Sequence, residues 1–500
     1  IPQWTHVHEV DLMNLNPAPE EVDAEDLQRL YENNVEIDKL VHLAGLIAKN
    51  KGGLVTGPAG VGKTLLFSIL KLFIYAEDPE AHVIATAPTH VAATLMNGKT
   101  NEHVLRKYAK AQGKHIWFLM DEFSMMTLDT LAEFSRRCMV DCNFVIFGDA
   151  RGQLEPISDS WAGKIDRSKI ESSVLMGQMT RGLHVHLSIY RRGVGRALFE
   201  DYTALYDMVH QHPNQVLPAL RNKYPIGNKE ALYRDHPDNV HVCVISHEKR
   251  KPLNKKLNQL HLKKIHPGTP TLHLKPTPDM MAQNLANLPQ PMTIFAGMRL
   301  QGCLRRSNAK IRNGLEYEVM GFDSQKVVVR LGRCYRKLVD QYVTASLRTQ
   351  LEPLIEPIIR QLKHWKMPLG PFTIFKTHSQ DVNAVLKRQT QLNAEERMRL
   401  LARRFPERLC LIDDQLALKE WGCDEEDEEE EAVDAMIELT HKQTVQWLRL
   451  PYALTYHTVQ GRTLKGRHIV LEDTNNVHFT MRNLIVGMSR ATDETLVHIV

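Results

Sequence analysis

The feature that most constrains the fold is a glycine-rich turn between two apolar segments. The turn reads Gly57-Pro58-Ala59-Gly60-Val61-Gly62-Lys63-Thr64, after a strand-like segment at residues 53–56 and before a helix-like segment at residues 64–75. A GxxxxGK(S/T) pattern in this setting is typical of a phosphate-binding loop, because its glycines let backbone N–H groups close around a phosphate. The N-terminus of the following helix adds positive potential. Lys63 is then placed to reach the β- and γ-phosphates of ATP, and Thr64 to hold Mg²⁺.

Short apolar segments recur along the chain and predict a parallel sheet. They lie at residues 82–86, 117–120 and 144–147, with a helical pattern at residues 128–138. Strands that alternate with helices are typical of parallel α/β folds. The same character returns near the end, in strand-like segments at residues 467–471 and 495–500. Between these parts, residues 295–332 indicate a small β unit with a turn at Asn313-Gly314.

Length and composition narrow the class of protein. The chain has 500 residues, 43% of them hydrophobic, which is enough for several packed domains. No stretch is apolar enough for a membrane helix, and the first residues lack the pattern of a secretory signal. Seven scattered cysteines indicate reduced thiols and an intracellular setting that could be nucleus, mitochondrion or viral replication site. Because an initiator Met is absent, we expect a piece of something longer.

The charge is unevenly distributed. The 63 Lys and Arg stand against 59 Asp and Glu, and eight of these acids are consecutive at residues 424–431. The remainder is therefore basic, with concentrations at residues 249–264 and 299–312, which favours a polyanionic partner. The acidic run has two open interpretations: a solvated loop, or a mimic of a polyanion that occupies its groove.

Two polar clusters follow predicted strands and suggest hydrolysis. Asp121 and Glu122 come directly after residues 117–120, where Asp121 can bind Mg²⁺ through water and Glu122 can orient and deprotonate an attacking water. Gln153, after the strand at 144–147, can contact both the γ-phosphate and that water. The phosphate loop, this carboxylate pair and the glutamine predict an ATP hydrolase.

Several further motifs occur along the sequence, and their order resembles that of a known protein family. Besides the phosphate loop, the sequence holds APTHVAA at 87–93, DEFSM at 121–125, GD…QL at 148–154, TYHTVQGRT at 455–463 and VGMSR at 486–490. Together and in this order they resemble superfamily 1 helicases, and the DExSM and GDxxQL forms resemble the RecD/Pif-like branch. The resemblance implies an α/β fold of two recA-like parallel-sheet lobes, a P-loop NTPase with an SH3-like β insertion in the second lobe. It divides the chain into a strap at 1–25, a first lobe at 26–180, a second lobe at 181–260 and 448–500, and an insertion at 261–447.

The resemblance also implies roles for single residues. Gln153 corresponds to the γ-phosphate sensor, and Arg490 and Arg191 to two arginine fingers, although Arg192 fits the second position equally well. The positions that correspond to DNA contacts are Pro88, Thr89, His103, Thr455 and His457. For the histidines a purely structural role stays open.

The sequence departs from the family pattern in four places. Gly152 is one residue extra before Gln153, and Thr458 stands where a lysine is usual. Residues 31–36 show no adenine-reading glutamine, and the segment between His103 and Trp117 leaves little room for a strand-separating pin.

These features predict an ATP- and Mg²⁺-dependent DNA helicase or translocase. Its partners would be single-stranded DNA and forked duplex DNA, its polarity 5′ to 3′, and its setting DNA replication, repair or recombination, alone or in a larger replication complex. Two alternatives stay open. One is an ATP-gated nucleic-acid clamp that hydrolyses slowly and does not unwind, and the other is a viral-type superfamily 1 RNA helicase.

Overall fold

The computed structural model describes most of the chain in two lobes and an insertion. The described residues are 4–9, 39–78, 80–108, 113–138, 142–156, 167–192, 196–281, 288–304, 310–332 and 436–500. None of the helices in these ranges is long and apolar enough to cross a membrane. The acidic run at 424–431, residues 31–36 and residues 305–309 of the basic stretch lie outside them.

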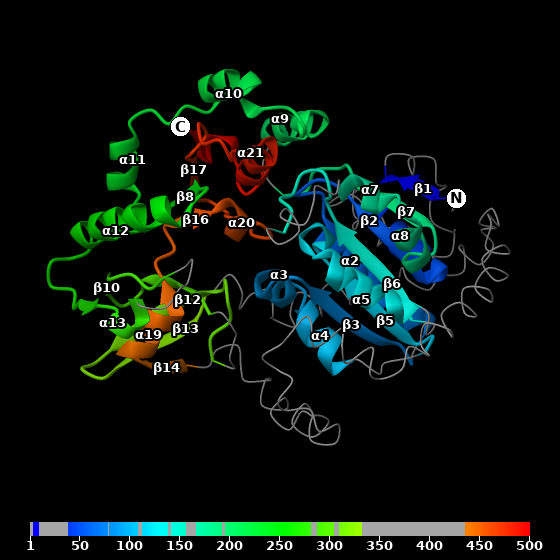
Figure 1. The fold of residues 1–500 in the computed structure, drawn as a ribbon, viewed down its shortest axis with the longest axis horizontal. Coiled ribbons are helices and arrows are strands. Elements are labelled where there is room, and N and C mark those ends of the chain that lie inside the picture. Colours follow the sequence, from blue (N-terminus) through cyan, green and yellow to red (C-terminus); the bar gives the residue numbers. More distant parts are fainter. Residues whose placement is uncertain are drawn as a thin grey trace, which may run out of the picture.

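The first lobe is a seven-stranded parallel sheet covered by helices (Figure 1). A helix at residues 39–50 and α2 (Lys63–Glu77) pack on one face with Leu119 and Val145, while α5 (Leu128–Cys138) and α8 (Val174–Met179) pack on the other with Phe118 and Ile146. The central strands of this sheet are mostly apolar because both of their faces are buried. In sheet order they are β1 (Thr5–His8), β7 (Leu183–His186), β2 (Gly52–Thr56), β6 (Asn143–Gly148), β5 (Ile116–Met120), β3 (His82–Ala87) and β4 (Lys99–Thr100).

The second lobe is a four-stranded parallel sheet with its own helices. Its strands, in sheet order, are β16 (Ala453–Thr455), β8 (Val240–Val244), β17 (His468–Leu471) and β18 (Val497–Ile499). The helices around it are α9 (Ala197–Ala204), α10 (Leu217–Lys223), α11 (Lys229–Asp235), α12 (His247–Lys264), α20 (Tyr456–Val459) and α21 (Met481–Met488). Short helices complete the two lobes: α3 (His90–Leu95), α4 (Asn101–Lys107), η2 (Phe123–Met125), α7 (Arg167–Glu171), η3 (Leu205–Met208), η4 (Pro213–Gln215) and η7 (Glu494–Leu496).

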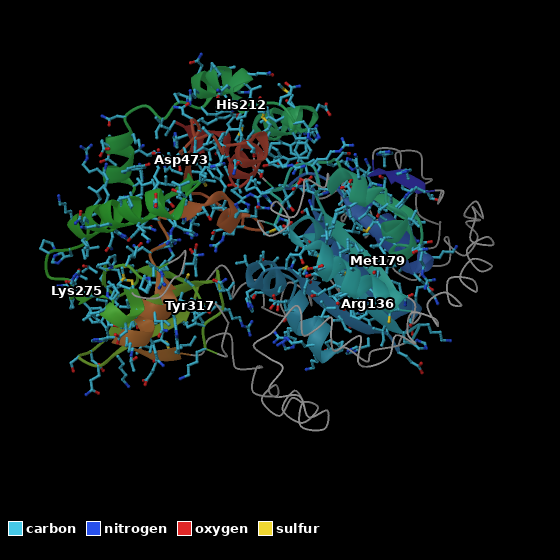
Figure 2. The ribbon with its side chains drawn as sticks, viewed as in Figure 1. Arg136, Met179, His212, Lys275, Tyr317 and Asp473 are labelled. Carbon is cyan, nitrogen blue, oxygen red and sulfur yellow. The ribbon has the colours of Figure 1, made fainter. Side chains whose placement is uncertain are left out.

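The insertion enters the second lobe between β8 and β16 and is antiparallel. Its five-stranded sheet has the order β14 (Met436–Thr440), β13 (Lys326–Leu331), β12 (Glu316–Phe322), β11 (Arg299–Gly302) and β15 (Leu448–Arg449). Beside it lie α13 (Pro278–Met281), α19 (His441–Trp447) and the hairpin of β9 (Leu272–Leu274) and β10 (Met292–Ile294). Side chains fill each layer, with Met179 inside the first lobe and Tyr317 inside the insertion (Figure 2). The predicted fold class, two parallel-sheet lobes with a β insertion, is confirmed.

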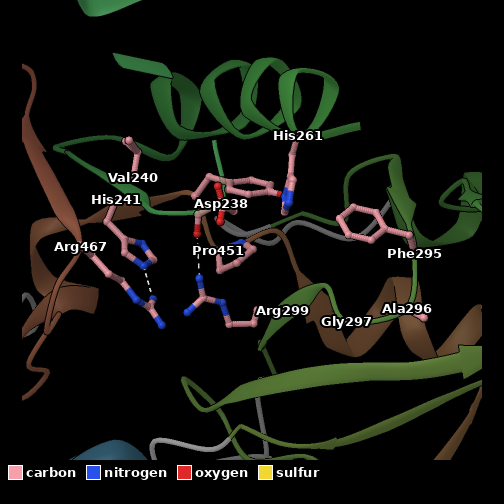
Figure 3. Close-up of a pocket in the computed structure, with 11 residues that line it drawn as sticks. Asp238, Val240, His241, His261, Phe295, Ala296, Gly297, Arg299, Pro451 and Arg467 are labelled. Atoms are coloured by element: carbon pink, nitrogen blue, oxygen red, sulfur yellow. Dashed lines mark hydrogen bonds between the residues drawn. The ribbon is translucent and has the colours of Figure 1, made fainter. Parts of the chain in front are cut away.

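A charged network joins the insertion to the second lobe. The Arg467 guanidinium, just before β17, pairs with the Glu316 carboxylate on β12 at 3.1 Å and donates to His241 on β8. Burial would raise the pKa of Glu316, but Arg467 and His241 outweigh it and bring the pKa to about 2. Beside this network is a cavity of about 240 Å³, across which Arg299 Nη2 donates to the Asp238 carbonyl at 2.7 Å (Figure 3). The network orients the insertion on its lobe.

Three predicted boundaries differ from the structure. Residues 5–8, placed in a strap, form β1 and pair in parallel with β7. Strand β7 in turn belongs to the first sheet, so that lobe extends beyond residue 180. The insertion sheet ends with β15, two residues past 447. Both β1 and β7 alternate His with Val, so they lack the apolar run that marks the other strands.

The histidines of β1 and β7 predict that the stability of the fold depends on pH. His184 lies opposite His6, with His8 and His186 next along the strands and Arg151 also nearby, and its Nε2 lies 2.7 Å from Thr56 Oγ1. Burial, and then the neighbouring charges, lower the pKa of His184 to about 4. The unfolded chain, with an ordinary histidine pKa, therefore takes up this proton first as the pH falls, and the stability held above about pH 6.5 is lost toward pH 4.

We expect His184→Gln to reduce the acid sensitivity of folding by about 1 kcal/mol between pH 7 and pH 5, measured by urea unfolding at both values. His210→Gln, a change at an exposed histidine, serves as the control and should leave the pH dependence as in the wild type. Equal pH dependence in the wild type and His184→Gln would contradict the prediction.

Candidate functional site

The phosphate loop has the conformation that its sequence predicts. Strand β2 ends at Thr56, and α2 begins at Lys63 with Gly62 as its N-cap at a φ of 90°. Gly57 has a φ of 153°, and a Cβ built on it would lie 2.4 Å from the Leu187 carbonyl oxygen. A side chain at that position would therefore both strain the backbone and collide with it.

Lys63 lies at the centre of this site. Its Nζ donates to the carbonyls of Gly57 at 2.7 Å and Pro58 at 2.9 Å. Burial lowers the pKa of Lys63, and the carboxylates of Asp149, Glu122 and Asp121 oppose that shift. The ammonium group thus balances a cluster of acids and lies against the loop where a phosphate would bind.

The two predicted carboxylates follow β5 directly. Asp121 is 8% exposed, and burial, followed by the charge of Glu122, raises its pKa to about 7. Its carboxylate accepts the backbone N–H of Glu122 at 2.8 Å. Glu122 itself has a left-handed backbone, with a φ of 54°, which is uncommon for a residue with a side chain and frequent at functional sites. This conformation lets two consecutive residues serve one site.

Gln153 reaches Glu122 despite the extra residue before it. The backbone N–H of Gly152 donates to the Asp149 carboxylate at 2.9 Å, and this turn takes up the added length. Gln153 Nε2 then donates to the Glu122 carboxylate, and Ser124 Oγ donates to Gln153 Oε1. The predicted sensor is therefore in direct contact with the predicted base.

Arg490, on the second lobe, lies buried near these acids. It is 2% exposed and bonds the Val486 and Arg462 carbonyls and the Ser489 hydroxyl. Burial lowers its pKa, and Glu122 is the strongest opposing charge, so the guanidinium lies within electrostatic reach of Glu122.

Arg191 and Arg192, the alternatives for the second finger, point to different partners. Arg191 forms an ion pair with Glu9 and donates to the Val61 carbonyl at 2.8 Å, on the back of the phosphate loop. Arg192 instead donates to the Ser489 carbonyl at 2.6 Å, across the boundary between the lobes. Burial, and then the charge of Arg490, lower the pKa of Arg192 to about 10, and Glu122 opposes this. The geometry favours Arg192 for a role at the lobe boundary.

The loop after β6 makes direct contacts with the second lobe. Arg482 donates to the Arg151 carbonyl at 3.2 Å and forms an ion pair with Glu155. Gln460 Nε2 donates to the Leu154 carbonyl at 3.3 Å. Gln153, which contacts Glu122, therefore lies inside a loop that the second lobe holds at both Arg151 and Leu154.

The predicted DNA contacts lie at the carboxyl ends of strands in both lobes. Pro88 and Thr89 follow β3, where Thr89 caps α3, and Thr455 ends β16, where it caps α20 with His457 in the first turn. Helices α3 and α20 face each other across the boundary (Figure 1). A Cβ built on Gly461, just after α20, would lie 4.0 Å from Ala92 on α3. His103 lies on α4, which follows β4 directly and packs on both β3 and α5.

The basic stretch at 249–264 is partly neutralised by its own lobe. It forms α12, where Lys249 lies 2.6 Å from Asp473, Lys256 2.6 Å from Glu230 and Lys264 3.3 Å from Asp238. These lysines therefore present less free positive charge to a polyanion than the sequence predicts.

Several contributing residues carried no sequence signal. Tyr202 donates to the Ala59 carbonyl of the phosphate loop at 2.6 Å, and Tyr206 donates to the Asp149 carboxylate. Both come from the segment that packs on α21, so only the fold brings them to the loop. Glu9, directly after the short strand β1, is likewise distant in sequence.

Comparisons with known proteins identify the domain that carries this site. The segment 43–179 matches the family model of an AAA domain. The matched segment contains the phosphate loop, both carboxylates and Gln153. No curated protein sequence matches the chain.

Solved Pif1 helicases have a similar arrangement at low identity. The Candida albicans Pif1 helicase is 15% identical, with 92% of this chain and 94% of that chain covered and a TM-score of 0.48. A structure of two coordinating Pif1 helicases at forked double-stranded DNA is 15% identical, with 92% and 90% covered and a TM-score of 0.46. Bacteroides Pif1 bound to single-stranded DNA is 15% identical, with 90% and 88% covered and a TM-score of 0.44.

We expect Gly152→Ala to lower the free energy of unfolding by about 1–3 kcal/mol, because the added Cβ would lie 2.2 Å from Tyr206 Oη and 2.6 Å from Asp149 Oδ2. Urea unfolding measures the effect. Gly321→Ala is the matched control, since no atom lies within 4 Å of its added Cβ. Wild-type stability in Gly152→Ala would show that the turn does not depend on glycine.

Proposed function

We propose that the protein is an ATP-dependent DNA helicase of the superfamily 1 RecD/Pif-like kind, which moves 5′ to 3′ on single-stranded DNA and unwinds duplexes. The contact between Gln153 and Glu122 carries the proposal, since the loop around Gln153 is held by Arg482 and Gln460 of the second lobe. This connects the group proposed to activate water to the lobe that would move. We place its use in DNA replication, repair or recombination.

The proposed reaction is the hydrolysis of ATP. Glu122 orients a water and takes its proton as the water oxygen attacks the γ-phosphorus. The bond from this phosphorus to the bridging oxygen breaks, and ADP and phosphate leave. Backbone N–H groups of the phosphate loop and Lys63 bind the phosphates, while Arg490 and Arg192 neutralise charge that develops in the transition state.

Thr64 and Asp121 fit a Mg²⁺ ion that accompanies ATP. Thr64 is exposed at the start of α2, and the Asp121 carboxylate lies in the same acidic cluster around Lys63. Hydroxyl and carboxylate oxygens are the ligands that this hard cation takes. When bound, the ion would neutralise phosphate charge.

Single-stranded DNA would cross the carboxyl ends of the strands in both lobes. Thr89 and Thr455 cap helices there, with Pro88 and His457 beside them, and hydroxyls, imidazoles and helix N-termini hold phosphates without reading bases. Burial lowers the pKa of His457, which therefore acts as a neutral hydrogen-bonding group. ATP-driven closure and opening of the lobes would alternate the grip of the two surfaces and produce a step. The Pif1 structures with single-stranded and forked DNA support this choice of partner.

We expect strand displacement on forked DNA with a 5′ tail and none on DNA with only a 3′ tail. Lys63→Ala is the control and should abolish displacement. Unwinding only from a 3′ tail would reverse the polarity. DNA-stimulated ATP hydrolysis without displacement would favour the clamp, and displacement only of RNA duplexes would favour the RNA helicase.

Glu122→Gln should lower ATP turnover by at least about 100-fold while nucleotide binding is kept, because the amide keeps the shape but cannot accept the proton. Steady-state hydrolysis and titration with a fluorescent ADP analogue measure the two effects. Glu133→Gln, which removes an exposed carboxylate paired with Arg136 on α5, is the matched control. Normal turnover in Glu122→Gln would exclude Glu122 as the base.

A further inference from the structure

A buried carboxylate from the N-terminal strand supports the phosphate loop from behind. Glu9, directly after β1, is 0% exposed. Its Oε2 accepts the backbone N–H groups of Ser188 and Ile189, each at 3.1 Å, and its Oε1 pairs with the Arg191 guanidinium. The side chain of Glu9 therefore fixes both the loop after β7 and the arginine at the end of that loop.

Arg191 passes this constraint to the phosphate loop through three contacts. Its Nη1 donates to the Val61 carbonyl at 2.8 Å, and its backbone N–H donates to the Gly60 carbonyl at 2.8 Å. Its Cδ lies 3.0 Å from the position of a Cβ built on Gly62. A guanidinium is a rigid, planar donor, so this side chain can set the path of the loop backbone.

Arg192 leaves the same segment in another direction. Its Nη1 donates to the Ser489 carbonyl, and Ser489 is the residue before Arg490. The two adjacent arginines therefore make different contacts: Arg191 binds the phosphate loop, and Arg192 binds the second lobe at the boundary.

We propose that Glu9 is a positioning residue that holds Arg191 against the phosphate loop, while Arg192, together with Arg490, faces the γ-phosphate. The inference rests on the proposed ATP hydrolysis and deepens it. It follows that β1, which contributes only four residues to the edge of the sheet, completes the nucleotide site. A buried ion pair broken on one side leaves an uncompensated charge, so Glu9 and Arg191 are expected to act as a unit.

Separate measurements of nucleotide affinity and turnover distinguish the two arginines. In Glu9→Gln the amide oxygen still accepts the two N–H groups but the ion pair is lost, so we expect about tenfold weaker binding of a fluorescent ADP analogue with kcat within about threefold. Arg191→Ala should show the same pattern, and the double variant should be no weaker than either single variant. Arg192→Ala should lower kcat by about 100-fold with ADP affinity within about threefold.

Two results would overturn the inference. One is a large loss of kcat in Arg191→Ala with unchanged ADP affinity, which would make Arg191 the finger. The other is wild-type affinity in Glu9→Gln. Glu133→Gln controls for the loss of a carboxylate, and thermal unfolding of every variant checks folding. If Glu9→Gln does not fold, Arg191→Lys tests the same contact, since a lysine keeps the charge without the planar donor and should also weaken ADP binding. A wild-type protein that binds no nucleotide would instead refute the proposed function.

Discussion

The site depends on charges that are buried together at the boundary between the lobes. Lys63 lies among Asp121, Glu122 and Asp149, while Arg192 and Arg490 approach from the other side. Burial disfavours each charge alone, as the raised pKa of Asp121 and the lowered pKa of Lys63 show. The groups are kept because they balance one another. A bound polyphosphate with its cation changes that balance, which gives the nucleotide a means of changing how the two lobes fit.

The sequence predicted those parts of the fold in which local pattern and burial agree. Apolar runs identified β2, β3, β5 and β6, because strands buried on both faces must be apolar over their whole length. The phosphate loop was predictable residue by residue, since its glycines meet steric demands that few other residues can meet. The carboxylate pair after β5 was predictable for a related reason, because topology brings the ends of parallel strands to one edge.

Other features depend on contacts that a linear pattern does not encode. Strands β1 and β7 alternate histidine with valine, and only their pairing shows that they extend the first sheet. The choice between Arg191 and Arg192 was open because both neighbour the same motif, and Glu9, far away in sequence, distinguishes them. Likewise, the lysines of α12 form a basic stretch in the sequence, but in the structure they pair with acidic residues on other elements. In each case the deciding contact joins residues distant in sequence.

The loop that follows α20 lies between the insertion and the carboxylate of Glu122. Arg462 donates to the Gly314 carbonyl and lies 3.8 Å from the Glu316 carboxylate, so this loop and the insertion are joined. One residue earlier, a Cβ on Gly461 would lie 3.8 Å from Glu122 Oε1. A force applied to the insertion, such as the resistance of a duplex, would thus act a few ångströms from the carboxylate proposed to activate water. The insertion and the carboxylate proposed to activate water would be connected through a single short loop. The rate of ATP hydrolysis would therefore change with the mechanical force on the insertion.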